Sequence, residues 1–203
     1  MIRSKSATRF LKHVRKTCKK YGITFKIGQG KTIIMKPFTF KVLGYFDEDN
    51  KILACAKGRS EEAFLSVLVH EFAHALQWIE KDQRYTNCNH RKYGSVQNAV
   101  CLWVEDKLKI RNKELKNYIQ KTIACELDAE RRSIKIIKTY GLPIDLNRYC
   151  LNASATLFSY WITVKTKQWD VKIGPKQMKA SGSSLRRSFK SLPKTVETSF
   201  INA

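Results

Sequence analysis

The chain has 203 residues, 43% of them hydrophobic, which is enough apolar material for a folded core and excludes a disordered polypeptide. Its 39 Lys and Arg outnumber 17 Asp and Glu, and the resulting net charge of +22 favours polyanionic partners such as nucleic acid. No apolar run has the length of a membrane span and no signal-peptide core is evident, so we expect no membrane-spanning segment.

The first part of the chain is predicted to form one helix followed by short strands. Apolar residues recur at helical spacing over 7–20, in a segment rich in Lys and Arg. A transit peptide would look similar, but a basic surface helix is the favoured interpretation. Alternating and β-branched segments follow, and the polar run 47–50 predicts a hairpin turn. The expected strands are 23–27, 32–35, 38–46 and 51–56.

The rest of the chain is predicted to be mainly helical. A polar, irregular stretch at 82–94 separates the first two of these helices, and Gly141 with Pro143 ends the third. The segment 175–203 is rich in Ser, Gly and Lys and is predicted to be a loosely ordered basic tail after a single domain over 1–174. The expected helices are 60–80, 95–108, 114–140 and 145–164.

The positive charge is distributed unevenly. Residues 1–46 contain twelve Lys and Arg and no acid, and residues 176–194 contain six and no acid. Such segments are typical of nucleic-acid-binding surfaces, and also of basic surfaces that only keep a protein soluble. Both interpretations stay open at this point.

The six cysteines are scattered and form no Cys-x-x-Cys pair, which predicts reduced thiols in an intracellular protein rather than a disulfide framework. Cys88 and His90 have the spacing of half a structural zinc site. No second pair at ligand spacing accompanies them.

The segment His70-Glu71-Phe72-Ala73-His74 is the strongest chemical signal in the chain. Histidines four residues apart lie on one face of a helix, one turn from each other. This His-Glu-x-x-His spacing is typical of a zinc protease, in which the glutamate is the general base. The competing interpretation is a chance match, or a pair of histidines that only complete a helix core.

A second cluster, in the predicted helix 114–140, supplies acids for the same site. A catalytic zinc needs a third protein ligand and a position left for water. Glu126 can supply that ligand, and Glu130, one turn later, can hydrogen-bond a liganding histidine. The competing interpretation is a solvated acidic patch on a basic helix.

The order of helix, small sheet, histidine helix and glutamate helix resembles the zincin-like metallopeptidases, in particular their gluzincin branch. The resemblance covers about residues 32–140 and rests on the motif of 70–74 and on Glu126 with Glu130, where gluzincins usually have Asp. It implies an α+β fold, with a small antiparallel or mixed sheet packed on an active-site helix and a mainly helical C-terminal half. The gluzincin third ligand is a glutamate from a later helix.

A longer stretch is similar to uncharacterised metallopeptidase-like proteins that are common in tailed-phage genomes. The similar residues are the segments 126–132 and 140–145, then Tyr149 and the pair 152–153. This resemblance implies a viral or prophage origin. The expected location is therefore the cytoplasm, that of the host if the protein is viral.

These residues together predict a zinc-dependent peptidase. His70, His74 and Glu126 are the expected ligands of one Zn2+ ion, with water in the fourth position. Glu71 is the expected catalytic base, which takes a proton from that water and delivers it to the leaving amine. The expected substrate is a protein or a peptide. Candidates for stabilising the oxyanion are Tyr149, Tyr160 and His90.

Three other functions remain open. The first is a non-catalytic nucleic-acid-binding or virion-associated protein that retains the fold. The second is a DNA-associated protease of the SprT type, although the third ligand there is a histidine and His90 is the nearest downstream candidate. The third is a structural zinc site, which would be closed by four protein ligands.

Overall fold

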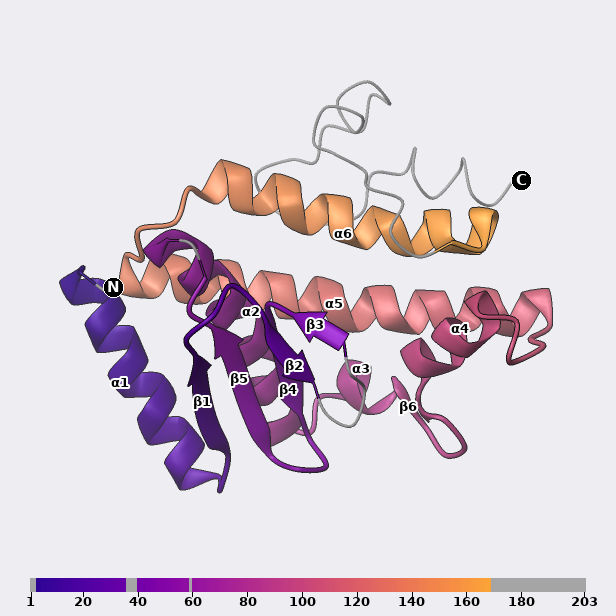
Figure 1. The fold of residues 1–203 in the computed structure, drawn as a ribbon, viewed down its shortest axis with the longest axis horizontal. Helices are drawn as coiled ribbons and strands as arrows, with labels where there is room; N and C mark the ends of the chain where they lie inside the picture. The colour runs from indigo at the N-terminus through magenta and orange to yellow at the C-terminus, as the bar shows by residue number, and fades with distance from the viewer. Residues whose placement is uncertain (1–2, 36–39, 59, 169–203) are drawn as a thin grey trace. The chain divides into compact units, whose positions relative to one another are not determined.

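A computed structural model describes residues 3–35, 40–58 and 60–168 of the chain (Figure 1). The chain is of the α+β class, as predicted, with helices and small sheets. It divides into two compact units, one of Met1–Asp82 with Ala129–Asp145, the other of Gln83–Asp128 with the chain from Leu146 on. The predicted tail at 175–203 lies outside the described residues, and the single domain over 1–174 stays a prediction.

Helix α1 (Lys5–Lys20) opens the first unit and begins two residues before the predicted start. Ser4 is the reason, because its side chain accepts a hydrogen bond from the Ala7 amide and caps the helix. The apolar stripe of α1 is buried. At its centre the Phe10 ring contacts Phe72 edge-on at 5.9 Å and Tyr140 at 5.2 Å between ring centroids.

A mixed sheet of three strands follows α1, in the order β1 (Thr24–Gly28), β5 (Ile52–Ala56), β4 (Gly44–Asp47). Strand β1 is parallel to β5, and β4 is antiparallel to it across the predicted hairpin turn. The central strand β5 is almost entirely buried because it also packs on helix α2. Strand β4 is at one end of this sheet, and α1 lies alongside β1 at the other (Figure 1).

The predicted single strand at 38–46 is wrong. Its described part forms two strands, β3 (Phe40–Val42), which pairs with β2 (Ile33–Met35), and β4, which pairs with β5. The chain changes partner at Leu43, whose side chain is 56% exposed and whose carbonyl accepts from the Ala56 amide. In the sequence, the alternation of Phe38, Phe40 and Val42 breaks at Leu43-Gly44, and this short irregularity is the one local sign of the change.

Helix α2 (Glu61–Ile79) carries the histidine motif and matches the predicted 60–80. Ser60 caps it by accepting from the Ala63 amide, and two glutamates in the first turn complement the helix dipole. The helix packs on β4 and β5. Its buried residues are mostly apolar: Phe64, Leu65, Leu68, Val69, Phe72, Ala73, Ala75 and Gln77.

Helix α5 (Asn112–Tyr140) is continuous, and its C-terminal part from Ala129 on belongs to the first unit. Two side chains hold that part against α2 and the residues that follow α2. Ser133 Oγ donates to the Val69 carbonyl at 3.2 Å, and Arg132 pairs with Asp82 at 3.0 Å. These contacts set the rotation of α5 about its axis, and so decide which of its side chains face the histidines.

The second unit contains α3 (Gln83–Thr86), β6 (Asn89–His90), β7 (Gly94–Ser95), α4 (Val96–Val104), the first part of α5 and α6 (Leu146–Thr166). Two predictions here need correction. The stretch 82–94 is not irregular throughout, since it contains α3 and the β6–β7 hairpin, elements too short to give a periodic pattern. The helix predicted near 95–108 ends at Val104, before Asp106 with its positive φ of 59°.

Among the described residues, no helix combines the length and the apolar character that crossing a bilayer requires.

Candidate metal centre

The two histidines of the motif converge on one point beside α2. Their Nε2 atoms are 3.2 Å apart, and the rings are nearly perpendicular, with centroids 4.7 Å apart. This arrangement follows from the four-residue spacing, which stacks His74 one helical turn from His70. The spacing does not determine which nitrogen of each ring faces the other ring. The residues that contact the two rings determine this.

Gln77 orients His74. Its side chain is fully buried on the same helix, and its amide oxygen is 2.9 Å from His74 Nδ1. An amide oxygen only accepts, so the Nδ1 atom carries the proton and the lone pair of the neutral ring is on Nε2. Sequence analysis missed this residue. Its one signal was a Gln on the apolar face of a helix, three positions after a candidate ligand.

Glu130 plays the corresponding role for His70. Its Oε1 atom is 3.1 Å from His70 Nδ1, and its side chain is only 7% exposed. The carboxylate lies at ion-pair distance from Nδ1. A proton on Nδ1 would face this oxygen, which favours the tautomer of a neutral His70 ring whose lone pair is on Nε2. Glu130 is also the acid that the four-residue spacing on α5 predicted to lie beside a histidine.

With both rings in these tautomers, the two Nε2 lone pairs face the same space and repel, and a cation bound there would remove the repulsion. A zinc ion with two nitrogens at about 2.0–2.1 Å in tetrahedral geometry would hold those atoms roughly 3.3 Å apart. The observed 3.2 Å separation is close to that distance. The donor set therefore fits a metal of the zinc type.

Glu126 completes the donor set. It lies on α5 one turn before Glu130, with a partly buried side chain. His70, His74 and Glu126 each offer one ligand atom, and these atoms all lie within 4.8 Å of one another. Two imidazoles and a carboxylate are a ligand set that zinc accepts. These are the three residues that the sequence predicts as ligands of one metal ion.

The other third-ligand candidates have different partners. Asp128 pairs with Arg84 at 2.7 Å. His90 Nε2 is 2.8 Å from the Tyr118 hydroxyl, while His90 Nδ1 accepts from the amide of Lys92 at 3.2 Å. Both ring nitrogens of His90 are thus engaged, which counts against His90 both as a zinc ligand and as half of a site with Cys88. The oxyanion candidates Tyr149 and Tyr160 lie on α6, in the second unit, and that role stays a prediction.

Glu71 borders strand β4. A Cβ atom built on Gly44 would lie 2.9 Å from Glu71 Cγ and 2.5 Å from Val67 Cγ1, so only glycine leaves room there. The carboxylate also affects the neighbouring strand. Burial, and after it the negative charge of Glu71, raise the pKa of the Cys55 thiol on β5. Glu71 is therefore held, half-buried, in the space between α2 and the sheet.

Replacing Gln77 by Leu tests whether the buried amide orients His74. The leucine fills similar space but accepts no hydrogen bond, so the imidazole loses its preferred tautomer. We expect zinc affinity to fall about tenfold to hundredfold, as for other lost partners of liganding histidines. Competition with a chromophoric chelator measures the dissociation constant.

The matched control is Gln120→Leu, the same substitution at an exposed position of α5. It should leave zinc affinity unchanged. Melting curves of the metal-free proteins separate a loss of fold from a loss of affinity. An unchanged dissociation constant for a folded Gln77→Leu protein would contradict the assigned role.

Comparisons with known proteins found no matching family model, no matching curated protein and no matching solved structure. The fold class by itself implies no particular chemistry. The geometry of the histidine and glutamate side chains therefore carries the functional assignment.

Proposed function

We propose that this chain is a zinc-dependent peptidase with a zincin-like fold of the gluzincin type. The observation that carries the proposal is the convergence of the His70 and His74 Nε2 atoms, 3.2 Å apart, with the Glu126 carboxylate within 4.8 Å. Zinc, when bound there, supplies a Lewis acid that polarises a scissile carbonyl and makes water a nucleophile near neutral pH.

Glu71 is the residue that moves the proton. It follows His70 directly on α2, and its half-buried carboxylate is the base that takes a proton from the attacking water. The same carboxyl group then returns the proton to the amine that leaves. Packing against Gly44 limits its freedom and keeps it on the strand side of the helix.

Strand β4 supports a peptide as the substrate. It ends the described three-stranded sheet, and its Gly44 brings backbone close to Glu71. A strand at the end of a sheet has N–H and C=O groups that can pair with an added extended chain. A peptide bound in this way would lie beside the proposed base.

The number of ligands favours catalysis over a structural metal. Structural zinc sites are closed by four protein ligands, whereas catalytic sites use three and keep a position for water or substrate. Within the described residues, the group around the two histidines has three members. This count supports a site with one position left for a reactant.

Gly44→Ala is expected to lower both stability and turnover. The added methyl overlaps Val67 and Glu71, at 2.5 and 2.9 Å, and β4 cannot withdraw without breaking its pairing with β5. Overpacking of this kind costs about 1–3 kcal/mol of stability. Because Glu71 is displaced while the histidines are not, zinc content should stay at the parental level.

A second substitution separates the loss of stability from the loss of turnover. Val67→Ala removes the closest overlap with the new methyl group. If that overlap causes the loss of stability, the double variant Gly44→Ala/Val67→Ala should recover part of it. Turnover should stay low because the contact with Glu71 remains. If Gly44→Ala melts and turns over like the parent, the close packing described here is wrong.

The proposed activity is tested with a peptide library digested by the purified protein and read by mass spectrometry. We expect new peptide termini with the zinc-loaded protein, none after treatment with a chelator, and recovery when zinc is added back. A folded protein with one zinc per chain that generates no zinc-dependent termini would contradict a peptidase.

A further inference from the structure

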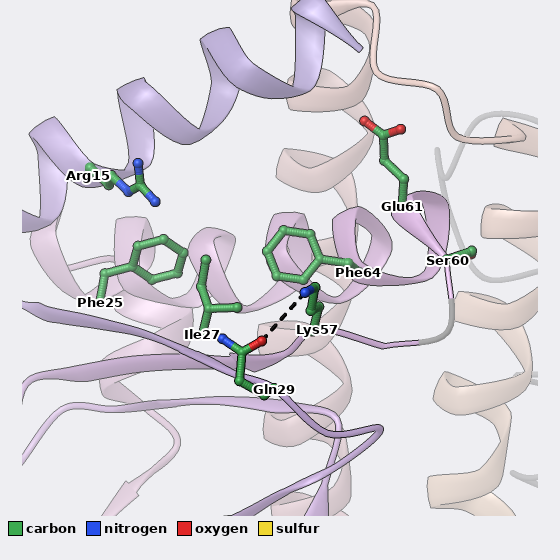
Figure 2. Close-up of a pocket in the computed structure, with 8 residues that line it drawn as sticks. All are labelled: Arg15, Phe25, Ile27, Gln29, Lys57, Ser60, Glu61 and Phe64. Carbon is green, nitrogen blue, oxygen red and sulfur yellow. Dashed lines mark hydrogen bonds between the residues drawn. The ribbon is translucent and has the colours of Figure 1, made fainter. Parts of the chain in front are cut away.

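A pocket lies in the first unit, bordered by α1, β1 and the start of α2 (Figure 2). Its volume is about 450 Å³, in the range of sites for small organic groups. The pocket uses the β1 end of the sheet, whereas Glu71 borders β4 at the other end. Its lining residues are Arg15, Phe25, Ile27, Gln29, Lys57, Ser60, Glu61 and Phe64.

The lining combines an apolar wall with cations. Phe25 and Ile27 are two residues apart and lie on the same face of β1. Together with Phe64 of α2 they line the pocket, so two aromatic rings border it (Figure 2). Arg15 and Lys57 are exposed at its border, and Lys57 Nζ donates to Gln29 Oε1 at 3.5 Å. Such a site suits a flat, apolar group that carries negative charge.

Glu61 is the only acid among the eight lining residues, and α1 neutralises much of its effect. One carboxylate oxygen accepts from the Arg3 amide, the Ser4 amide and the Ser4 hydroxyl, at 3.1, 3.0 and 2.9 Å. The hydrogen bond from the Ser4 amide is the largest of the effects that lower the pKa of Glu61. This carboxylate therefore holds the start of α1 and is already paired.

The cations extend beyond the pocket along α1. Arg15 belongs to a row at helical spacing whose side chains are all exposed. From the first to the last member the row spans about 21 Å at 1.5 Å per residue. A small anion needs only the two cations of the pocket, whereas a row of this length fits an anionic polymer. The row consists of Lys5, Lys12, Arg15 and Lys19.

We propose that the α1–β1 pocket and the basic row of α1 form a binding site for single-stranded nucleic acid. One unpaired base enters the pocket and stacks on the half-buried Phe25 ring, while the buried Phe64 completes the apolar wall. The flanking phosphates contact Arg15 and Lys57. Aromatic stacking combined with a basic track is the general means of holding single strands without sequence preference. The proposal is independent of the peptidase activity, because it uses none of the residues of the metal centre.

The test measures fluorescence anisotropy of a labelled oligothymidylate of about twelve nucleotides, within the usual site size of single-strand-binding folds. Arg15→Gln/Lys57→Gln should weaken binding at least about tenfold and flatten the salt dependence by about 1.4 in log–log slope, the value for two lost phosphate contacts. The charge-matched control Lys113→Gln/Lys116→Gln, at exposed positions of α5, should change affinity less than about twofold.

The base is tested separately from the phosphates. An abasic strand with the same number of phosphates should bind the parent about tenfold more weakly, and Phe25→Leu should remove most of that difference. The comparison of abasic and base-bearing strands uses only the parent protein. It therefore still tests the role of the base if a variant folds poorly. Glu71→Gln protein should bind like the parent, which separates this site from the proposed catalysis.

Four results would overturn the proposal. They are no binding at about 50 mM salt, equal losses in the pocket and control variants, equal affinity for the abasic and the base-bearing strand, and equal competition by polyglutamate. The last result would instead assign the surface to an acidic polypeptide.

Discussion

Glu71→Gln is expected to retain zinc and to lose peptide hydrolysis almost completely. The amide has the size of the carboxylate but cannot accept the proton of the attacking water. General-base catalysis contributes about 10²- to 10⁴-fold, so kcat should fall by that factor. Metal analysis and cleavage of a library-derived peptide, measured on the same sample, give both quantities.

The control for this experiment is Glu105→Gln, the same change at an exposed turn after α4. It should alter neither zinc content nor turnover. Two outcomes of the Glu71 variant are informative. Lost activity with retained zinc supports the assigned role, whereas cleavage at the parental rate would show that another group is the base.

Alanine at any one of the three proposed ligands is expected to empty the metal site. His70→Ala and His74→Ala each remove a nitrogen, and Glu126→Ala removes the carboxylate. Loss of only an outer hydrogen-bond partner already costs about tenfold to hundredfold in affinity, so loss of a ligand should cost more than about hundredfold. Zinc per chain after dialysis, measured by mass spectrometry, reports the result.

His13→Ala is the matched control, because His13 is an exposed histidine of α1. It should retain full zinc content. The Glu126 variant is the most informative of the three. An unchanged zinc content there would move the third ligand elsewhere, and Glu130, already 3.1 Å from His70, would be the first residue to test.

The parts of the fold that could be predicted are those with a long, strong periodic pattern. Helix α2 was predicted at 60–80 and lies at Glu61–Ile79, because an apolar face, a serine cap and two acids in the first turn all indicate the same start. The β4–β5 hairpin was predicted for a similar reason, since a polar run separates two apolar segments.

Short elements and changes of partner could not be predicted. Strands β6 and β7 have two residues each, too few for any alternation to be recognised. The break between β3 and β4 depends on which strand lies alongside, and the interruption of the alternation at Leu43-Gly44 is too short to indicate a change of pairing partner. The division of the chain into two units was likewise not visible in composition.

At the candidate site, the sequence indicated the groups that act through their own chemistry. His70, His74, Glu71 and Glu126 were candidates because ligand and base residues are few and their spacing is restrictive. Gln77 and Gly44 were missed. Their importance comes from contacts, an amide oxygen 2.9 Å from His74 and the lack of a side chain beside Glu71, which only the folded chain creates.

X-ray absorption spectroscopy of the purified, zinc-loaded protein tests the central claim most directly, because it reports the atoms around the metal itself. We expect one zinc per chain, surrounded by nitrogen and oxygen at about 2.0–2.1 Å, with the scattering pattern of two imidazoles, and no bound zinc in the dialysed His74→Ala protein. Sulfur neighbours at about 2.3 Å, or a His74→Ala protein that keeps its zinc and gives the parental spectrum, would contradict the site described here.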